Sequence, residues 1–369
     1  MPDKTLLMLT TGGTIAGNVA RDDGDPEEHI DNEALATVIE PTAARLEETW
    51  GVRVRLESQR IDDVDSSDIL PSHWIALVDA IQEKYDDYDG FIVTHGTNTM
   101  GYTCAALSFA LNNLNKPVVV TGSQVPFGWP GSDALMNLDN ALRVATYPYD
   151  GGIRGVVCVF GSHIITGTRA KKATEFDLDA FTSFSAAGLG RIGRIIYMND
   201  EHLKRHHAYL ARGGTQPALL ARDLAVSNGF DTRILSFTEF PGMLPDLFQA
   251  ALEGLVERDE PLIRGVVFRA FGAGDVSTHL HPCFEYLKSK EVPVVVTTQA
   301  PNGNSNFRVN DPGKELATRE LAIPAHDMSI EAITTKLAWL LARGTSYAKM
   351  PAAMHEDLHG EISVFPDRR

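Results

Sequence analysis

The sequence predicts a two-domain α/β protein, with a larger N-terminal doubly wound parallel sheet and a smaller C-terminal α/β domain. At 369 residues the chain is too long for one ordinary hydrophobic core. Several short apolar runs end directly in Thr, Ser and Gly, and helical patterns separate them. Continuous apolar runs are typical of strands buried on both faces, and strand–helix–strand order is typical of a doubly wound sheet.

The predicted strands are LLML (6–9) before TTGGT, FIV (91–93) before THGTNT, VVV (118–120) before TGSQ, and VVV (294–296) before TTQ. Helical patterns occupy residues 73–85 and 99–114. Ligands of doubly wound sheets bind at the carboxyl ends of the strands. We therefore expect the polar clusters to converge on one edge of the sheet and to form the site.

Composition divides the chain into three parts. Residues 1–203 form the predicted N-terminal α/β domain, which should hold the site. Residues 204–230 are rich in Gly, Ala, Arg and His with weak periodicity, and are predicted to be a linker. Residues 231–369 form the predicted C-terminal α/β domain, which ends in a helical pattern over 329–342.

The charge and the apolar segments exclude several classes of partner. With 49 acidic against 33 basic residues, the net charge is −16, which disfavours nucleic acid and anionic lipid. The N-terminal apolar run is too short for a signal peptide, and no stretch approaches a membrane span, so a cytoplasmic location is expected. Cys104, Cys158 and Cys283 are odd in number and lack a CxxC pattern, so we expect buried core residues.

A glycine-rich turn, TGGTIAG (11–17), follows the first predicted strand. It matches neither of the common phosphate-binding patterns. Its adjacent glycines leave the hydroxyls of Thr11 and Thr14 with little steric cover. A hydroxyl can attack a carbonyl carbon if another group takes its proton, so the turn offers a candidate nucleophile.

The segment HGTNTMGYT (95–103) follows a strand and begins a helix. Thr97 and Asn98 are expected near the helix N-terminus, where backbone N–H groups favour a carboxylate or an oxyanion. Ordinary helix capping by Thr and Asn is the alternative. His95 is predicted to be structural, because no HExxH pattern or nearby His or Cys offers a metal site.

Two further polar segments are weaker signals. DSSD (65–68) provides Asp65, Ser66 and Ser67, which alone indicate only a helix N-cap. RAKKAT (169–174) provides Lys171 and Lys172. A lysine pair usually lies on a solvated face, but a buried lysine is a plausible base for a hydroxyl.

The acidic run DDGDPEEHIDNE (22–33) follows the glycine-rich turn. One interpretation is a solvated acidic loop. The other is a lid over the site, because the run leaves directly from the turn that holds the candidate nucleophile.

Taken in order, these motifs resemble the bacterial asparaginase family, and most of all its cytoplasmic branch. The order is TGGTIAG, DSSD, HGTNTM, KPVVVTGSQVP, and then Arg169, Lys172 and Asp179 to Phe181. The similarity continues to DMSIEAITTKL (327–337) and covers nearly the whole chain. TGGT and HGT-x-TM together are highly specific.

The resemblance implies a threonine-based amidohydrolase that converts L-asparagine to L-aspartate and ammonia. It implies a homodimer or homotetramer with sites between the N-domain of one subunit and the C-domain of another, and no metal or organic cofactor. The implied roles are Thr14 as nucleophile, Thr97 and Lys172 as a second hydroxyl–base pair, and Asp65, Ser66 and Ser67 as ligands of the substrate's α-carboxylate and amino group.

Three positions depart from the family. Asn98 replaces an Asp that binds the substrate's α-ammonium group and supports the lysine. The family usually has a Tyr in the lid, but this chain has no Tyr before Tyr85, and His29 is a candidate to replace it. Asp275 stands where the cytoplasmic branch has Asn. If it reaches the site from the neighbouring subunit, the exchange keeps one carboxylate near the ammonium group; the alternative is that Asp275 points into solvent.

These departures leave two alternatives open. The same mechanism could act on a related amide, lactam or cyclic imide without a free α-amino group, because the lost carboxylate removes a charge-assisted hydrogen bond. The chain could instead be a catalytically weak amino-acid-binding protein on the same fold.

Overall fold

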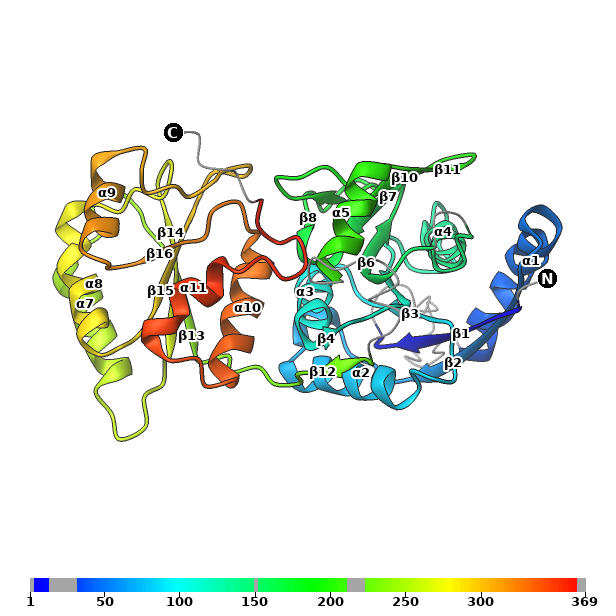
Figure 1. Cartoon of the computed structure of the whole chain (residues 1–369), viewed down its shortest axis with the longest axis horizontal. Helices are drawn as coiled ribbons and strands as arrows, with labels where there is room; N and C mark the ends of the chain where they lie inside the picture. The colour runs from blue at the N-terminus through cyan, green and yellow to red at the C-terminus, as the bar shows by residue number, and fades with distance from the viewer. Residues whose placement is uncertain (1–2, 13–31, 149–151, 211–222, 364–369) are drawn as a thin grey trace. The chain divides into compact units, whose positions relative to one another are not determined.

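The computed structural model describes residues 3–12, 32–148, 152–210 and 223–363 (Figure 1). The chain divides into two compact units, Met1–Asn228 with Leu358–Gly360, and Gly229–Asp357 with Glu361–Arg369. The first unit includes helix α5 (Asp200–Leu210) and strand β12 (Ala225–Val226), which both fall partly or wholly within the range 204–230.

The main sheet of the first unit has the strand order β11-β10-β7-β6-β5-β3-β1-β2 among the described residues. Its strands are β1 (Asp3–Thr10), β2 (Arg53–Arg60), β3 (Gly90–Thr94), β5 (Pro117–Thr121), β6 (Gly155–Phe160), β7 (His163–Thr166), β10 (Gly190–Ile192) and β11 (Ile196–Met198). From β2 to β6 every neighbouring pair is parallel, which confirms the predicted sheet.

The sheet continues beyond β6 with antiparallel strands, which the sequence patterns did not indicate. Phe160 pairs with His163, so Gly161 and Ser162 form a two-residue hairpin loop. Gly161 has a φ of 54°, a conformation that glycine adopts at little cost and that tight hairpins use.

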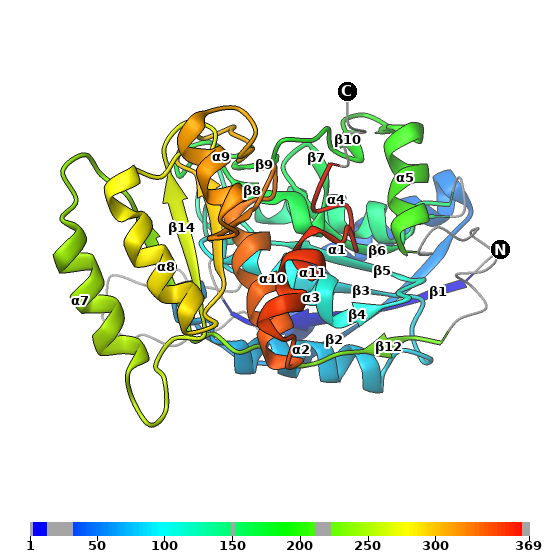
Figure 2. The same ribbon diagram turned by 60° about the vertical axis from the view of Figure 1, so that its left-hand side comes forward.

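Helices cover both faces of this sheet (Figure 2). They are α1 (Asn32–Trp50), α2 (Pro71–Glu83), α3 (Met100–Ala110) and α4 (Ala134–Ala145). Leu6 and Met8 of β1 share a core cluster with Leu46 of α1 and Leu138 of α4. Because strand side chains alternate between faces, Leu7 and Leu9 point to the opposite face, and both are also buried. Burial on both faces explains the continuous apolar runs.

Shorter elements complete the first unit. They are the 3₁₀ helices η1 (Ser66–Asp68) and η2 (Gly167–Arg169) and the strands β4 (Leu111–Asn112), β8 (Ala170–Lys172) and β9 (Phe181–Ser183). β8 and β9 form an antiparallel hairpin outside the main sheet, in which Lys172 pairs with Phe181.

The strand order places a topological switch point between β1 and β3. Strand β1 lies between β2 and β3, and the sheet then grows outward through β5 and β6. Ligands of open α/β sheets bind in the crevice at the carboxyl ends of the strands on either side of such a point. The segments that follow Thr10 and Thr94 are therefore where a site is expected.

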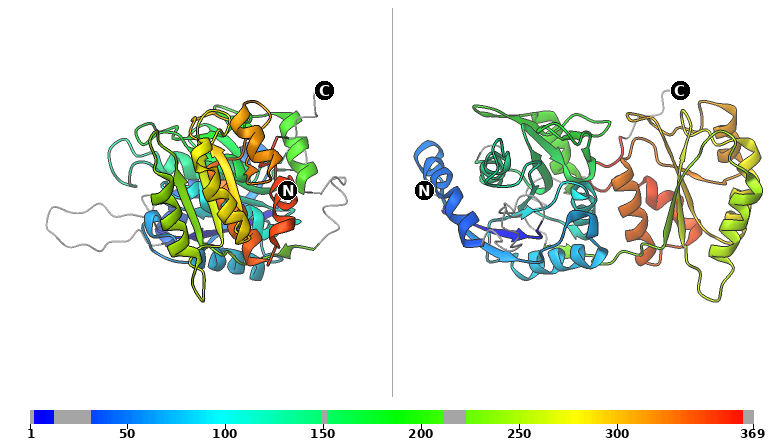
Figure 3. Two further views of the ribbon diagram at one scale, coloured as in Figure 1. Left: turned by 90° about the vertical axis from the view of Figure 1, so that its left-hand side faces the viewer. Right: turned by 180° about the vertical axis from the view of Figure 1, so that it is seen from behind.

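The second unit contains the parallel sheet β13-β14-β15-β16 (Figure 3). Its elements are β13 (Ile234–Thr238), α7 (Pro245–Val256), β14 (Gly265–Ala270), η3 (Thr278–Leu280), α8 (His281–Ser289), β15 (Val294–Thr298), α9 (Asp311–Thr318), β16 (Ile323–Pro324), α10 (Ile330–Ala342), η4 (Tyr347–Lys349) and α11 (Met350–His355). Phe248 of α7 and Phe284 of α8 pack on one face against Phe268 of β14. Helix α10 contacts the same strand through Leu337, which lies against Gly265.

Two sequence expectations can be compared with these units. Cys104, Cys158 and Cys283 are all free and buried, which confirms the expected core role. In the part of the chain that the structure describes, no helix is both long and apolar enough to cross a membrane.

Candidate active site

The turn after β1 is fixed to two neighbouring segments. The Thr11 backbone N–H and hydroxyl both donate to the Thr94 carbonyl oxygen, at 3.2 and 3.1 Å. Gly12 has a φ of 91°, and a Cβ there would lie 2.6 Å from the Val64 nitrogen, so only glycine fits. Gly12 is the last described residue of this turn, and Thr14, the expected nucleophile, lies outside the described residues. So do His29 and residues 22–31 of the acidic run.

The segment DSSD forms a capped 3₁₀ turn, as its N-cap pattern indicated. The Asp65 carboxylate accepts a 2.7 Å hydrogen bond from the Ser67 backbone N–H. Hydrogen bonds from this N–H and from the Ser67 hydroxyl lower the pKa of Asp65, so the carboxyl stays ionised at neutral pH. Asp65 and Ser67 are exposed, whereas Ser66 is buried.

The DSSD turn is joined to the segment after β3. The Ser66 hydroxyl oxygen accepts the Asn98 backbone N–H at 3.3 Å, and the Ser66 carbonyl accepts the Thr99 hydroxyl at 2.6 Å. The Asn98 side-chain amide donates to the Ser67 hydroxyl oxygen at 3.3 Å. Gly96 permits this approach, because a Cβ there would lie 2.6 Å from Ser66 Oγ.

Lys172 lies beside these residues at the end of β8. Its Nζ is 2.8 Å from Thr97 Oγ1 and 2.9 Å from Asn98 Oδ1. The Lys172 side chain is 11% exposed, and Thr97 is buried. An amine next to a buried hydroxyl can exchange a proton with it.

Glu175 is a third partner of Lys172, which sequence reasoning missed. Its Oε2 lies 2.8 Å from Lys172 Nζ, although the Glu175 side chain is 79% exposed. The available signal was an acid three residues after the candidate lysine. Its meaning depends on the β8–β9 turn, which brings the two side chains together.

Gln124, in the GSQ segment after β5, holds this turn. Its side-chain amide donates to the carbonyl oxygens of Glu175 and Asp177, at 3.1 and 3.4 Å. The Gln124 backbone N–H donates in turn to the Asp133 carboxylate at 3.0 Å. The segment after β5 therefore helps to hold the β8–β9 turn that carries Glu175.

His95 is structural, as expected. It is fully buried, with Nδ1 2.7 Å from the Gly96 carbonyl oxygen and Nε2 2.8 Å from Thr103 Oγ1. Trp74 also donates to Thr103 Oγ1, at 3.0 Å. Burial lowers the pKa of His95 to about 4, so the imidazole is neutral at neutral pH.

Asp275 lies in the second unit, just beyond β14. It is half-buried, and its Oδ2 accepts a 2.6 Å hydrogen bond from the Asn310 side chain. The residues that the structure brings together are therefore those of the first unit, Asp65, Ser66, Ser67, Thr97, Asn98 and Lys172.

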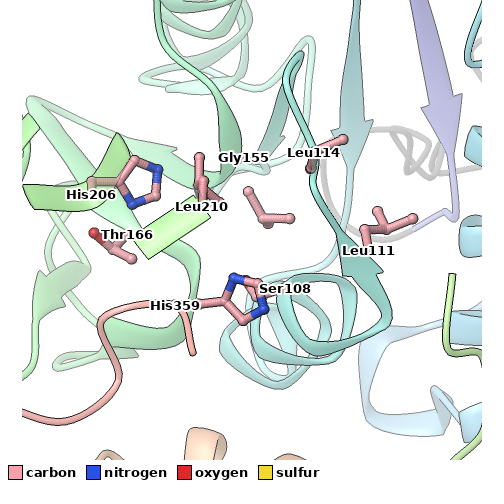
Figure 4. A pocket seen from close by; sticks show the side chains of 9 residues that line it. Ser108, Leu111, Leu114, Gly155, Thr166, His206, Leu210 and His359 are labelled. Carbon is pink, nitrogen blue, oxygen red and sulfur yellow. The ribbon is translucent and has the colours of Figure 1, made fainter. Parts of the chain in front are cut away.

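Two cavities lined by described residues lie elsewhere. One, of about 10 Å³, lies between Ser108, Thr166 and His206 and has room for about one water (Figure 4). The other, of about 860 Å³, lies in the second unit beside β16 and includes none of the expected site residues. No group of three His, Cys, Asp or Glu in the described ranges is placed to hold a metal ion.

Both units of the chain match known protein families. Residues 5–204 match the family model described as "Asparaginase, N-terminal", and residues 233–354 match "Glutaminase/Asparaginase C-terminal domain". L-asparaginase 1 of Escherichia coli K12 is 34% identical over 304 residues, which cover 81% of this chain and 82% of that protein.

Two further proteins are similar over nearly the whole chain. A glutamyl-tRNA(Gln) amidotransferase subunit from Aeropyrum pernix is 31% identical over 98% of this chain and 80% of its own length. The solved structure of the thermostable L-asparaginase from Thermococcus kodakarensis aligns with a TM-score of 0.81 and 28% identity, over 98% of this chain and 100% of that one.

Proposed function

Because the chain belongs to the asparaginase family of amidohydrolases, we propose that it hydrolyses L-asparagine to L-aspartate and ammonia with Thr14 as nucleophile. The observation that supports this proposal most strongly is the Lys172–Thr97 pair, with Nζ 2.8 Å from a buried hydroxyl at the switch point of the sheet. A protein that only binds amino acids has no need of a hydroxyl paired with an amine.

The proposed reaction has two stages. The Thr14 hydroxyl oxygen attacks the side-chain amide carbon, an ester to Thr14 forms, and the amide nitrogen takes a proton and leaves as ammonia. Water then attacks the ester carbon, which releases aspartate and restores the Thr14 hydroxyl. Thr97 and Lys172 relay the proton, with Lys172 as its acceptor.

The DSSD turn is the proposed binding site for the substrate's α-substituents. The exposed Ser67 hydroxyl can turn its single proton from Asp65 to the α-carboxylate, and the ionised, exposed Asp65 can then accept from the α-ammonium group. Ser66 holds Asn98 in place, because the Ser66 hydroxyl oxygen accepts the Asn98 backbone N–H.

We also propose that Asp275 reaches the ammonium group from a neighbouring subunit, so that the enzyme acts as a homodimer or homotetramer. Asp275 keeps a polar partner, Asn310, in the second unit of its own subunit. A cytoplasmic location is part of the same proposal, because the motifs resemble most of all the cytoplasmic branch of the family.

One observation favours a second substrate class. Asn98 presents an amide, and its oxygen already accepts from Lys172. An amide, lactam or cyclic imide without an α-amino group needs no carboxylate at this position. A substrate attached to RNA is less well supported, because the net charge of −16 repels a polyanion.

A panel of amides tests this proposal. Ammonia release is measured with L-asparagine, D-asparagine, L-glutamine, succinamate and simple cyclic imides. The highest kcat/KM is expected for L-asparagine, with one aspartate formed per ammonia. A preference for succinamate or an imide supports the second substrate class, and no turnover of any compound contradicts both.

A further inference from the structure

The amino group of Lys172 has three hydrogen-bond partners within the described residues. They are Thr97 Oγ1 at 2.8 Å, Asn98 Oδ1 at 2.9 Å and Glu175 Oε2 at 2.8 Å. The first two belong to the segment after β3, whereas Glu175 lies in the turn that follows β8. Glu175 is thus the acidic group in contact with the proposed proton acceptor.

These partners differ in whether they can donate a hydrogen bond. The oxygen of an amide and the oxygen of a carboxylate can only accept, whereas a hydroxyl can either donate or accept. A neutral lysine amine has two N–H donors and one lone pair. When Asn98 and Glu175 accept the two N–H groups, the lone pair faces the hydroxyl of Thr97.

We propose that Glu175 is a positioning residue that, with Asn98, directs the lone pair of Lys172 at the proton of Thr97. This role rests on the proposed function. As the Thr97 proton passes to Lys172 Nζ, the electron pair of that O–H bond stays on Oγ1, which takes the proton of the attacking hydroxyl or water. The lysine is then an ammonium group with three N–H donors, and all three partners accept.

The same contacts therefore serve both protonation states, and no side chain has to move during the transfer. The proton returns to the departing nitrogen, which leaves as ammonia, and the original arrangement is restored. A water molecule in place of Glu175 could donate to the lone pair as readily as accept from an N–H group, so it would not direct the amine.

The backbone around Glu175 is fixed even though its side chain is exposed. The Ala173 backbone N–H donates to the Ala180 carbonyl oxygen at 2.8 Å and closes the base of the turn. The Gln124 side chain donates to the Glu175 carbonyl oxygen at 3.1 Å from the end of β5. The carboxylate is therefore held within reach of Lys172 by groups that do not contact the amine.

Kinetics of three variants, with the best substrate of the amide panel, test the positioning role. Glu175→Ala should lower kcat about tenfold, a part of what general acid–base catalysis contributes, and change KM less than about twofold. Glu175→Gln keeps an accepting oxygen and should stay within about threefold of wild type. Asp177→Ala removes an exposed acid two residues away and should match wild type, and all three should melt at the wild-type temperature.

An unchanged kcat in Glu175→Ala overturns the positioning role. So does an equal loss in Glu175→Gln, because the charge and not the accepting oxygen would then matter. A wild-type protein that releases no ammonia from any amide overturns the proposed function, and the positioning role with it. An active wild type with fully active Glu175→Ala overturns the positioning role alone.

Discussion

Lys172 and Thr97 lie 75 residues apart in the sequence, yet the Lys172 amine is 2.8 Å from the Thr97 hydroxyl. Thr97 follows β3 of the main sheet, and Lys172 ends β8 of a separate hairpin. The contact therefore depends on the tertiary fold.

Lys172→Met should lower kcat by roughly 10²–10⁴, the range of general acid–base catalysis, with little change in the melting temperature. The matched control is Lys171→Met, because strand alternation turns Lys171 to the other side, toward the Phe184 ring at 5.7 Å. Steady-state ammonia release checks both variants. Equal losses in the two variants would assign the effect to the hairpin and not to the amine.

Asp275→Asn should weaken L-asparagine binding by about 1.5–3 kcal/mol, the range of a hydrogen bond to a charged group. The reason is the proposed contact between Asp275 and the substrate's α-ammonium group. Asn98→Asp alone should crowd its new carboxylate against Asp275 at the same substrate group and raise a pKa, and the double variant should recover activity.

Succinamate provides the control for this cycle, because it lacks the amino group. Its KM should be unchanged by Asp275→Asn. The KM values of both substrates in the four proteins of the cycle give the coupling energy. Additive effects of the two substitutions, or an equal rise in the KM of succinamate, would show that Asp275 does not contact the substrate's ammonium group.

The free energy of unfolding should fall as the pH drops from about 6.5 to about 4. Burial lowers the pKa of His95 from 6.5 to about 4, so unfolding takes up a proton within that window. The loss due to His95 should be about 2 kcal/mol between pH 7 and pH 5. Urea denaturation of wild type and His95→Gln at the two pH values measures it, and an identical pH dependence in the variant refutes this assignment.

Lys336→Met should destabilise the second unit by about 3–5 kcal/mol. Lys336 Nζ lies 2.6 Å from Glu361 Oε1, and both side chains are fully buried, so the substitution leaves the Glu361 carboxylate buried without its cation. The double variant Lys336→Met/Glu361→Leu should recover most of the loss. Denaturant unfolding checks this pair, and a loss below about 1 kcal/mol, typical of an exposed ion pair, would be inconsistent with its burial.

Much of the fold could be predicted because local patterns report burial on two faces. The runs at 91–93 and 118–120 became β3 and β5, and the pattern over 329–342 became α10, which Ser329 caps by accepting from the Ala332 N–H. The antiparallel strands after β6 were missed. They are only three or four residues long, and the reversal depends on one glycine conformation at Gly161.

The site was predictable to a smaller extent. The meeting of the segments after Thr10 and Thr94 follows from a parallel sheet, and the capped turn at Asp65 follows from its local sequence. The pairing of Lys172 with Thr97 came from family resemblance, because no local pattern relates the two residues. In the sequence, Glu175 is indistinguishable from an ordinary solvent-exposed acid. It becomes a partner of Lys172 only because the β8–β9 hairpin brings the two side chains together.

The most direct test of the account is ammonia release from L-asparagine by wild type and by Thr14→Ala, each at substrate saturation. Thr14→Ala removes only a hydroxyl and a methyl group from a small side chain, so the circular dichroism spectrum and melting temperature should match wild type. We predict equimolar ammonia and aspartate from wild type and a loss of at least about 10³-fold in the variant, since covalent catalysis has no substitute nucleophile. Turnover of Thr14→Ala at the wild-type rate would contradict the threonine mechanism.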